Sequence, residues 1–210
     1  MKFRTTKGPH SHGGDTVSGM MLTVLLALAP AAVVHVWFFG TGLLINLLVA
    51  ALTALGCEAL MLRARGRPVG FYLSDYSAVV TAALIAFALP PLLPWWITAI
   101  GVAFAIMVAK HLYGGLGHNI FNPAMAGYVV LLVSFPEEMT RWPLPDLGGL
   151  DQVFAGIGGA FSVLFTGSLP AGLQWDAITG ATPLSTIQSR LGNADMMSEI
   201  VLAPIFGSMA

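Results

Sequence analysis

An apolar stretch from Met20 to Phe39 limits what this chain can fold into, because Thr23 and His35 are its only polar interruptions. A helix needs about 20 apolar residues to cross the hydrocarbon core of a bilayer. Hydrophobic residues make up 56% of the chain and charged residues only 9%, whereas soluble chains carry roughly 25% charged residues. We therefore expect a membrane protein.

The start of this stretch can be mistaken for an export signal, since basic residues precede it and Ala27-Leu28-Ala29 resembles a cleavage site. The apolar stretch continues well past that site to Phe39, longer than the apolar region of such signals. We expect an uncleaved first span that follows a cytoplasmic tail, residues 1–19.

Two further stretches have the length of a span, Leu43 to Leu62 and Trp95 to Leu112. If the spans alternate, with one more crossing between the second and the third, seven basic residues fall on one side of the membrane: Lys2, Arg4, Lys7, Arg63, Arg65, Arg67 and Lys110. Cytoplasmic loops carry an excess of lysine and arginine, so this side is expected to be cytoplasmic.

Two shorter apolar segments, residues 77–89 and 123–135, are about 20 Å long as helices, against a hydrocarbon core of about 30 Å. They align without a gap, SAVVTAALIAFALP beside PAMAGYVVLLVSFP, and each ends on a proline. We expect an all-α polytopic membrane protein, in which a bundle over residues 20–136 combines full transmembrane helices with an internal repeat of half-helices. Paired interrupted segments point to a binding site at the membrane midplane. The alternative is two short helices buried by their neighbours, with no site between them.

Beyond Phe135 the chain becomes polar and rich in turns, so we expect residues 137–199 to lie outside the cytoplasm. Within that region Val153 to Phe165 is apolar but short and interrupted by glycines, which favours a helix packed on the surface over a span. The apolar stretch that begins at Ile200 predicts a further membrane segment, residues 200–210, cut off by the end of the sequence.

Two carboxylates are predicted at membrane depth, Glu58 in the second span and Asp75 before the first half-helix. A carboxylate at the centre of a membrane helix costs about 2.5 to 3.5 kcal/mol, so such residues are candidates for an ion path. The alternative for Glu58 is that it extends toward Arg63 or Arg65. Three histidines are scattered singly and are assigned no role: His35, His111 and His118.

The polar residues before each half-helix also have a local explanation. Asp75 can cap the first half-helix by accepting from the amide of Ser77 or Ala78. Asn119 and Asn122 can satisfy amides left bare where the second half-helix begins. The two asparagines can equally hydrogen-bond a planar cofactor.

Composition excludes several kinds of chemistry. Nine lysines and arginines and a net charge of -1 leave no basic face for nucleic acid. Cys57 is the only cysteine, and with no cysteine–histidine cluster the sequence predicts no metal site. Redox chemistry in this chain would therefore need an organic cofactor.

A short motif, Asp176 to Leu184, combines small residues with a helix start. Thr182 suits an N-cap and Pro183 the first helical position, which is a sufficient structural explanation for these two residues. Gly180 and Ala181 before them would leave the Thr182 hydroxyl open to a bulky reagent. A helix N-terminus also favours a phosphate group.

This motif, DAITGATPL, resembles the sequence D-x-x-(S/T)-G-A-(S/T) that bacterial flavin transferases recognise when they attach FMN to the last residue through a phosphoester. Two longer segments, LSDYSAVVTAALIAFALPPLLPWW and GGLGHNIFNPAMAGYVVLLVSFPEEMTRW, are similar to the D-subunit family of Rnf-type ion-translocating oxidoreductases. The sister family is the B-subunit family of the sodium-pumping NADH:quinone oxidoreductases. The short tail before Met20 and the TGATPL sequence favour the Rnf family.

The resemblance implies that Thr182 carries FMN and that Asp176, Thr179, Gly180 and Ala181 belong to the attachment motif. It implies a complex in the bacterial inner membrane that moves electrons between ferredoxin and NAD and drives Na+ or H+ across that membrane. The partners would be the other membrane and peripheral subunits of the complex, a flavin transferase during maturation, and membrane lipid.

Within such a complex this chain would be one component of a translocase and would hold no catalytic residue. We expect Thr182 on the extracytoplasmic side. A second flavin, non-covalent riboflavin, is a further expectation at Asn119 and Asn122. Family members continue through more membrane segments than this sequence contains. Two other classes stay open on the residues alone: a cofactor-free secondary transporter, and a structural membrane scaffold.

Overall fold

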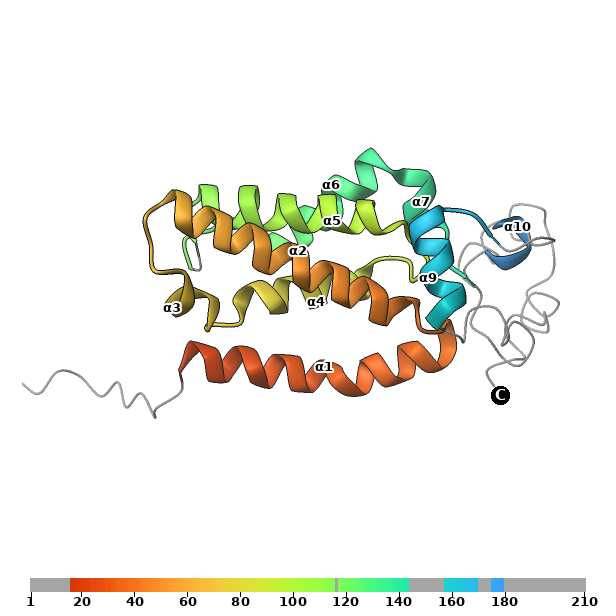
Figure 1. Cartoon of the computed structure of the whole chain (residues 1–210), viewed down its shortest axis with the longest axis horizontal. Helices are drawn as coiled ribbons and strands as arrows, with labels where there is room; N and C mark the ends of the chain where they lie inside the picture. The colour runs from red at the N-terminus through yellow and green to blue at the C-terminus, as the bar shows by residue number, and fades with distance from the viewer. Residues whose placement is uncertain (1–15, 116, 144–156, 170–174, 180–210) are drawn as a thin grey trace, which may run out of the picture.

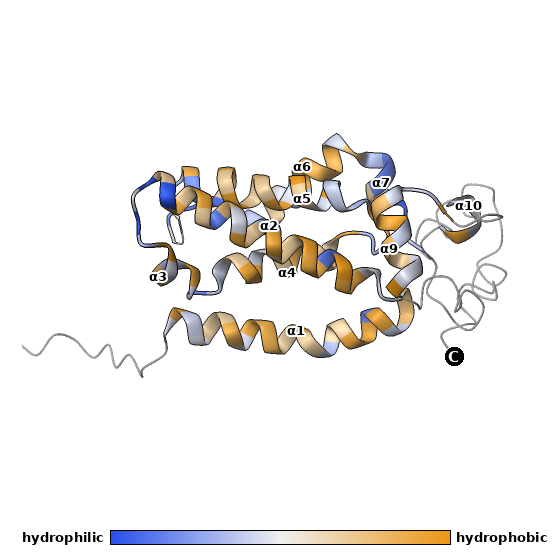
Figure 2. Ribbon diagram, viewed as in Figure 1, coloured by the Kyte–Doolittle hydropathy of each residue, from blue (hydrophilic) through white to orange (hydrophobic). Residues whose placement is uncertain are grey.

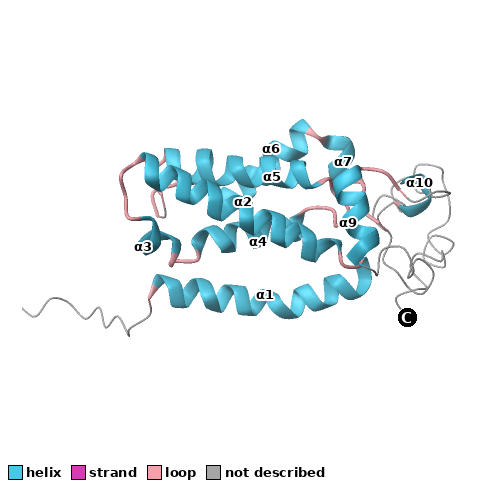
Figure 3. Ribbon diagram, in the orientation of Figure 1, coloured by secondary structure: helices cyan, strands magenta, loops and turns pink. Residues whose placement is uncertain are grey.

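The computed structural model describes residues 16–115, 117–143, 157–169 and 175–179 (Figure 1). Over these ranges the chain forms helices and loops (Figure 3). One isolated antiparallel bridge joins Pro143 and Thr179. The predicted all-helical class is confirmed for this part of the chain.

The helices follow one another along the chain, and the longest of them run lengthwise in the bundle (Figure 1). They are α1 (Val17–Phe39), α2 (Gly42–Ala64), α3 (Val69–Leu73), α4 (Ser77–Ala88), α5 (Trp95–Phe104), the π-helix η1 (Ala105–Leu112), α6 (Pro123–Ser134), α7 (Pro136–Thr140), α9 (Ile157–Thr166) and α10 (Trp175–Ile178).

Among the described residues, three helices are long and apolar enough to cross a membrane: α1, α2, and the unit Trp95–Leu112 formed by α5 and η1. These are the three predicted spans, and they make the chain a multi-pass membrane protein. The first helix begins at Val17 and not at Met20, because the Thr16 side chain caps it by accepting from the Gly19 amide at 3.1 Å.

The two short apolar segments form helices of 12 residues each, α4 and α6. Both end close to a proline, Pro90 after α4 and Pro136 after α6, since the residue before a proline is disfavoured in helical conformation. The helices therefore stop where the sequence pattern ends them. Their equivalence as an internal repeat stays a prediction.

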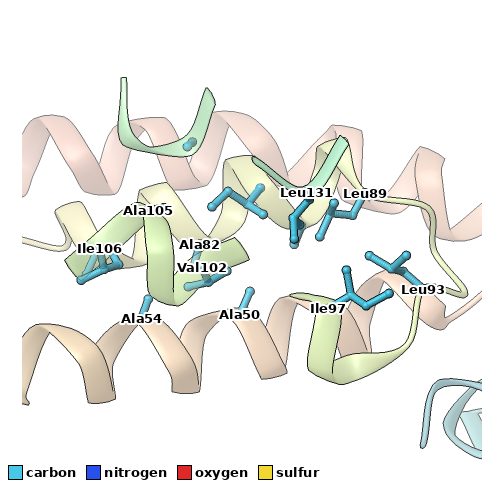
Figure 4. Packing of buried hydrophobic residues seen from close by; sticks show 14 of the residues in the cluster. Ala50, Ala54, Ala82, Leu89, Leu93, Ile97, Val102, Ala105, Ile106 and Leu131 are labelled. Carbon is cyan, nitrogen blue, oxygen red and sulfur yellow. The ribbon is translucent and has the colours of Figure 1, made fainter. Parts of the chain in front are cut away.

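The core of the bundle is built from small and aliphatic side chains. Helix α2 packs most extensively against α4. Figure 4 shows buried alanines at this interface, Ala50 and Ala54 on α2 and Ala82 on α4, with Val102 of α5 beside them. Small residues let membrane helices approach closely, because no bulky side chain separates the backbones.

Close backbone approach is also what joins α6 to α5 and η1. A methyl group at Gly127 would lie 2.7 Å from the carbonyl oxygen of Gly101 and 3.0 Å from Cβ of Ala105. Leu131, one turn further along α6, is fully buried against the same helices. Glycine at position 127 thus sets the distance between α6 and the third span.

A buried amide fixes the irregular segment between α4 and α5. Asn46 of α2 donates to the carbonyl oxygens of Pro90 at 3.3 Å and Pro91 at 3.2 Å. Its own side-chain oxygen accepts from the Thr98 hydroxyl at 3.1 Å. Non-helical backbone at membrane depth needs such partners, since lipid supplies none.

The two ends of the bundle differ. The start of α1, the end of α2, helix α3 and the end of η1 lie at one end, whereas α7, α9 and α10 lie at the other (Figure 1). Figure 2 shows apolar residues along the helices and hydrophilic residues gathered toward the ends. The described basic residues at positions 63, 65, 67 and 110 belong to the first end, as the order of the spans predicts. That this end is cytoplasmic stays a prediction.

Helix α9 covers the beginning of α2. It has 10 residues, fewer than a span needs, and its Val163 and Leu164 are buried in a cluster with Ile45 of α2, Leu92 and Ile178 of α10. The apolar sequence around position 160 therefore packs on the end of the bundle.

We expect Gly42→Ala to destabilise the protein by about 1–3 kcal/mol, because the added methyl group would overlap the backbone carbonyl of Pro91, which cannot move aside like a flexible side chain. Gly56→Ala on the same helix is the matched control, since nothing lies within 4 Å of its Cβ position. Alanine there should be neutral or stabilising by up to about 1 kcal/mol. Thermal unfolding in detergent compares the two; equal melting temperatures would contradict the packing described.

Candidate functional site

An ion pair lies inside the bundle, between the second and third spans. The Nζ atom of Lys110 donates to both carboxylate oxygens of Glu58, each at 2.9 Å. The two side chains are only 3% and 4% exposed. Burial at this level removes both charges from water, so each depends on the other for compensation.

Two further residues extend the pair into a chain of polar contacts. Lys110 Nζ also donates to the Ser77 hydroxyl at 2.8 Å, and that hydroxyl donates to Oδ1 of Asp75 at 2.6 Å. The Ser77 amide donates to the same Asp75 oxygen at 2.7 Å, which is the helix cap anticipated at the start of α4. We call the buried residues Glu58, Lys110 and Ser77, together with the partly buried Asp75, the buried polar cluster.

His111 lies against this cluster from the neighbouring position of η1. Its Nε2 atom is 3.0 Å from Oε2 of Glu58, close enough for an ionic contact. The direction of approach does not suit a hydrogen bond, and neither ring nitrogen has a hydrogen-bond partner among the described residues. The backbone carbonyl of His111 accepts from the Arg65 guanidinium. The ring is therefore buried with unused hydrogen-bonding capacity.

The π-helix places Lys110 and His111. The last eight residues of the third span, Ala105–Leu112, have this wider winding, which is rare and frequently occurs at functional sites. As a result two consecutive residues approach one carboxylate of α2.

A cavity of about 590 Å³ lies beside the buried polar cluster. It is walled by the start of α1, the end of α2, α3 and the loop after η1. Its lining includes the exposed Phe71 and the exposed Arg67, so it opens at the same end of the bundle as α3. Glu58, Asp75, Lys110 and His111 all line it. The cluster can therefore be reached from one side of the molecule.

The structure brings together the two predicted carboxylates and gives one of them an unforeseen partner. The sequence alternative for Glu58 is an extension toward Arg63 or Arg65, whereas in the structure it pairs with Lys110 of the third span. Both arginines are exposed at the end of α2, and Arg65 is occupied by the His111 carbonyl. The sequence predicts Lys110 only as a basic residue at the end of a span.

The two asparagines before α6 have different surroundings. Asn122 caps the helix, because its side-chain oxygen accepts from the Ala124 amide at 2.9 Å. Asn119 donates to the Phe121 carbonyl at 3.3 Å, and its buried Oδ1 has no partner in the described chain. Neither asparagine is among the residues that line the cavity.

The attachment motif lies partly outside the described residues, which include Asp176 and Thr179 but not Gly180, Ala181 or Thr182. Thr179 follows α10 at the end of the bundle remote from α3 (Figure 1). It bridges to Pro143, and its hydroxyl donates to the Trp175 carbonyl at 2.8 Å.

Sequence reasoning did not single out Lys110, Ser77 or His111 as site residues. The sequence does contain a pattern that points to Lys110, because Lys110 and Glu58 are opposite charges within two separate apolar stretches. Opposite charges within apolar spans tend to pair across helices. Nothing local distinguished Ser77 or His111.

Together these observations define a multi-pass helical membrane protein with a buried charged cluster that is accessible from one end. Comparison with known proteins gives its family. The model of the NQR2, RnfD, RnfE family matches residues 4–210, and the chain belongs to this family.

Several relatives carry the name of the D subunit of the ion-translocating oxidoreductase complex. That of Aeromonas hydrophila is 47% identical over 212 residues, which cover 97% of this chain and 60% of the relative. That of Escherichia fergusonii is 42% identical over 216 residues, covering 100% and 61%. That of Alcanivorax borkumensis is 49% identical over 204 residues, covering 97% and 56%. The chain thus spans about 60% of the length of the curated relatives it matches.

Proposed function

We propose that this chain is a membrane flavoprotein component of an Rnf-type redox-driven ion pump. In this function it passes electrons between ferredoxin and NAD through FMN bound covalently at Thr182, and couples the transfer to movement of Na+ or H+. The observation that carries the proposal is family membership together with the DAITGATPL motif. The relatives described above are named as parts of an ion-translocating oxidoreductase complex, which supports the same class of activity.

The residues that lead into the attachment motif are well placed to present it. Ile178 is buried, Thr179 pairs with Pro143, and the Arg141 guanidinium lies over the Trp175 ring at 5.2 Å. These contacts anchor the chain a few residues before Thr182. The Thr179 hydroxyl is already engaged with the Trp175 carbonyl, which favours Thr182 as the attachment point.

FMN, when bound, supplies reversible acceptance of electrons, which no side chain of this sequence provides. The part played by the chain is to hold the hydroxyl that forms the phosphoester and to set its position at the end of the bundle. Asp176, Gly180 and Ala181 would complete the sequence read by the transferase.

One observation supports a second, non-covalent flavin, namely a side-chain oxygen of Asn119 that has no hydrogen-bond partner in the described chain. The buried Oδ1 of Asn119 has no partner in the described chain, and it can accept from an N–H group of a planar ring such as that of riboflavin. Asn122 is engaged as a helix cap through its oxygen, so its amide group would be the part left to contact a ligand.

We place the ion path at the buried polar cluster. Glu58 and Asp75 line one cavity, and charged groups inside a membrane bundle commonly mark such paths. The positive ends of the α4 and α6 dipoles lie at Ser77 and Pro123. A change of charge in the membrane would therefore change the electrostatic potential at Asp75. In the proposed orientation the cavity faces the cytoplasm and Thr182 the opposite side.

The test is whether the flavin survives denaturation. The protein, purified with its complex and run on a denaturing gel, is expected to fluoresce yellow-green in its own band, because a phosphoester is not broken by detergent. A dark band would contradict covalent attachment.

The buried cluster and its cavity also suit a cofactor-free secondary transporter, which is the second candidate. Such a transporter would give a dark band and ion movement that is independent of electron donors. A protein of the sodium-pumping quinone oxidoreductase type would fluoresce but would need a quinone as electron acceptor.

A further inference from the structure

We propose that Lys110 is an internal counter-cation, which holds the Glu58 carboxylate while no transported ion is bound and which a monovalent cation entering through the cavity displaces. The inference rests on the proposed function in one respect, that Glu58 belongs to the ion path. An ion path through Glu58 does not by itself require Lys110. The inference assigns to Lys110 the role of holding the Glu58 carboxylate in place until a cation binds.

The Lys110 ammonium group is surrounded by oxygen atoms. Both Glu58 oxygens lie at 2.9 Å from it and the Ser77 hydroxyl at 2.8 Å, with the carboxylate of Asp75 directly behind that hydroxyl. Hard cations such as Na+ take oxygen ligands of this kind. A proton on Glu58 would remove the charge that holds the ammonium. Either ion therefore competes with Lys110 for the same carboxylate.

The pair is also placed where exchange is possible. It borders a cavity of about 590 Å³ and is not enclosed on all sides by apolar side chains. A lysine has a flexible four-carbon stem, so its ammonium can withdraw from Glu58 without movement of the helix. A buried ion pair of this kind is no more stabilising than apolar packing, which argues against a purely structural role.

His111 provides a second observation at the same carboxylate. It is only 3% exposed, it lines the same cavity, and its ring has no hydrogen-bond partner among the described residues, although Nε2 lies 3.0 Å from Glu58. An unsatisfied polar ring is costly unless it finds a partner in another state. Displacement of Lys110 by an incoming cation frees Glu58 to turn, and a hydrated ion would bring water within reach of the ring.

The test uses the complete complex in sealed vesicles and measures redox-driven cation uptake against cation concentration. One arm varies Na+ at fixed pH, and the other varies pH without Na+, which distinguishes the two ions. The titratable or charged groups that line the cavity together with Glu58 are Lys110, His111, Asp75, Arg67, Tyr72 and His118.

Lys110→Met removes the competitor, so the cation concentration that gives half-maximal uptake is expected to fall on the order of 5- to 150-fold in the arm of the pumped ion. Lys110→Arg should shift it in the opposite direction, since a guanidinium fork grips a carboxylate through two hydrogen bonds and cannot leave as easily. Arg63→Met, which removes an exposed cation at the same end of the bundle that does not line the cavity, is the control and should leave the value unchanged.

A half-maximal concentration that stays the same or rises in Lys110→Met would overturn the inference. If that variant does not assemble, Lys110→Arg decides, and an unchanged value there overturns it equally. Glu58→Gln distinguishes a failure of the proposed ion path from a failure of the role of Lys110. Normal uptake in Glu58→Gln would remove Glu58 from the ion path, whereas lost uptake together with an unshifted Lys110→Met would refute only the role of Lys110.

Discussion

Thr182→Ala is expected to leave the protein without any covalent flavin and to reduce redox-driven ion uptake to background. The reason is chemical, because the phosphoester requires a side-chain oxygen and alanine has none. If Thr182 caps a helix, as the sequence predicts, loss of that cap would cost only about 1 kcal/mol, so the protein should still fold and assemble. In-gel fluorescence and the intact mass of the chain measure the flavin directly.

Two neighbouring variants control this result. Thr182→Ser keeps a hydroxyl and satisfies the motif, so it should keep the flavin. Thr179→Ala should also keep it, because that hydroxyl donates to the Trp175 carbonyl and its loss costs about 1 kcal/mol of stability. A fluorescent band from Thr182→Ala, or a dark one from Thr179→Ala, would move the attachment to another residue.

The sequence predicted the helices well because their limits are set by nearby residues. The length of each apolar stretch located three spans and two short helices. Their ends follow local rules: Asn122 caps α6, Asp75 accepts from the Ser77 amide at the start of α4, and Pro90 follows the end of α4. A local cap or a proline needs no knowledge of the rest of the fold, which is why these boundaries agree to within a few residues.

The partner of Glu58 could not be found in this way. Lys110 is separated from it by 52 positions, and only the packing of the third span against the second brings them together. The rule that basic residues lie at the cytoplasmic ends of spans assigned Lys110 to the membrane surface. The π-helix that positions it has no recognised sequence pattern, so burial of this lysine became visible only in three dimensions.

Glu58→Gln is expected to have the second large effect. It leaves the Lys110 ammonium buried without the carboxylate that it contacts, and removal of one partner of a buried pair typically costs about 3–5 kcal/mol. We therefore expect both a lower thermal stability of the protein in detergent and a loss of redox-driven cation uptake. Unfolding curves and uptake into vesicles measure the two consequences separately.

The double variant Glu58→Gln with Lys110→Met distinguishes folding from function. It removes both charges, so no unpaired ion stays buried, and most of the lost stability should return. Uptake should remain absent, because the carboxylate that would bind the cation is still missing. Recovery of uptake along with stability would mean that the pair only holds the second and third spans together, and that the cation crosses elsewhere.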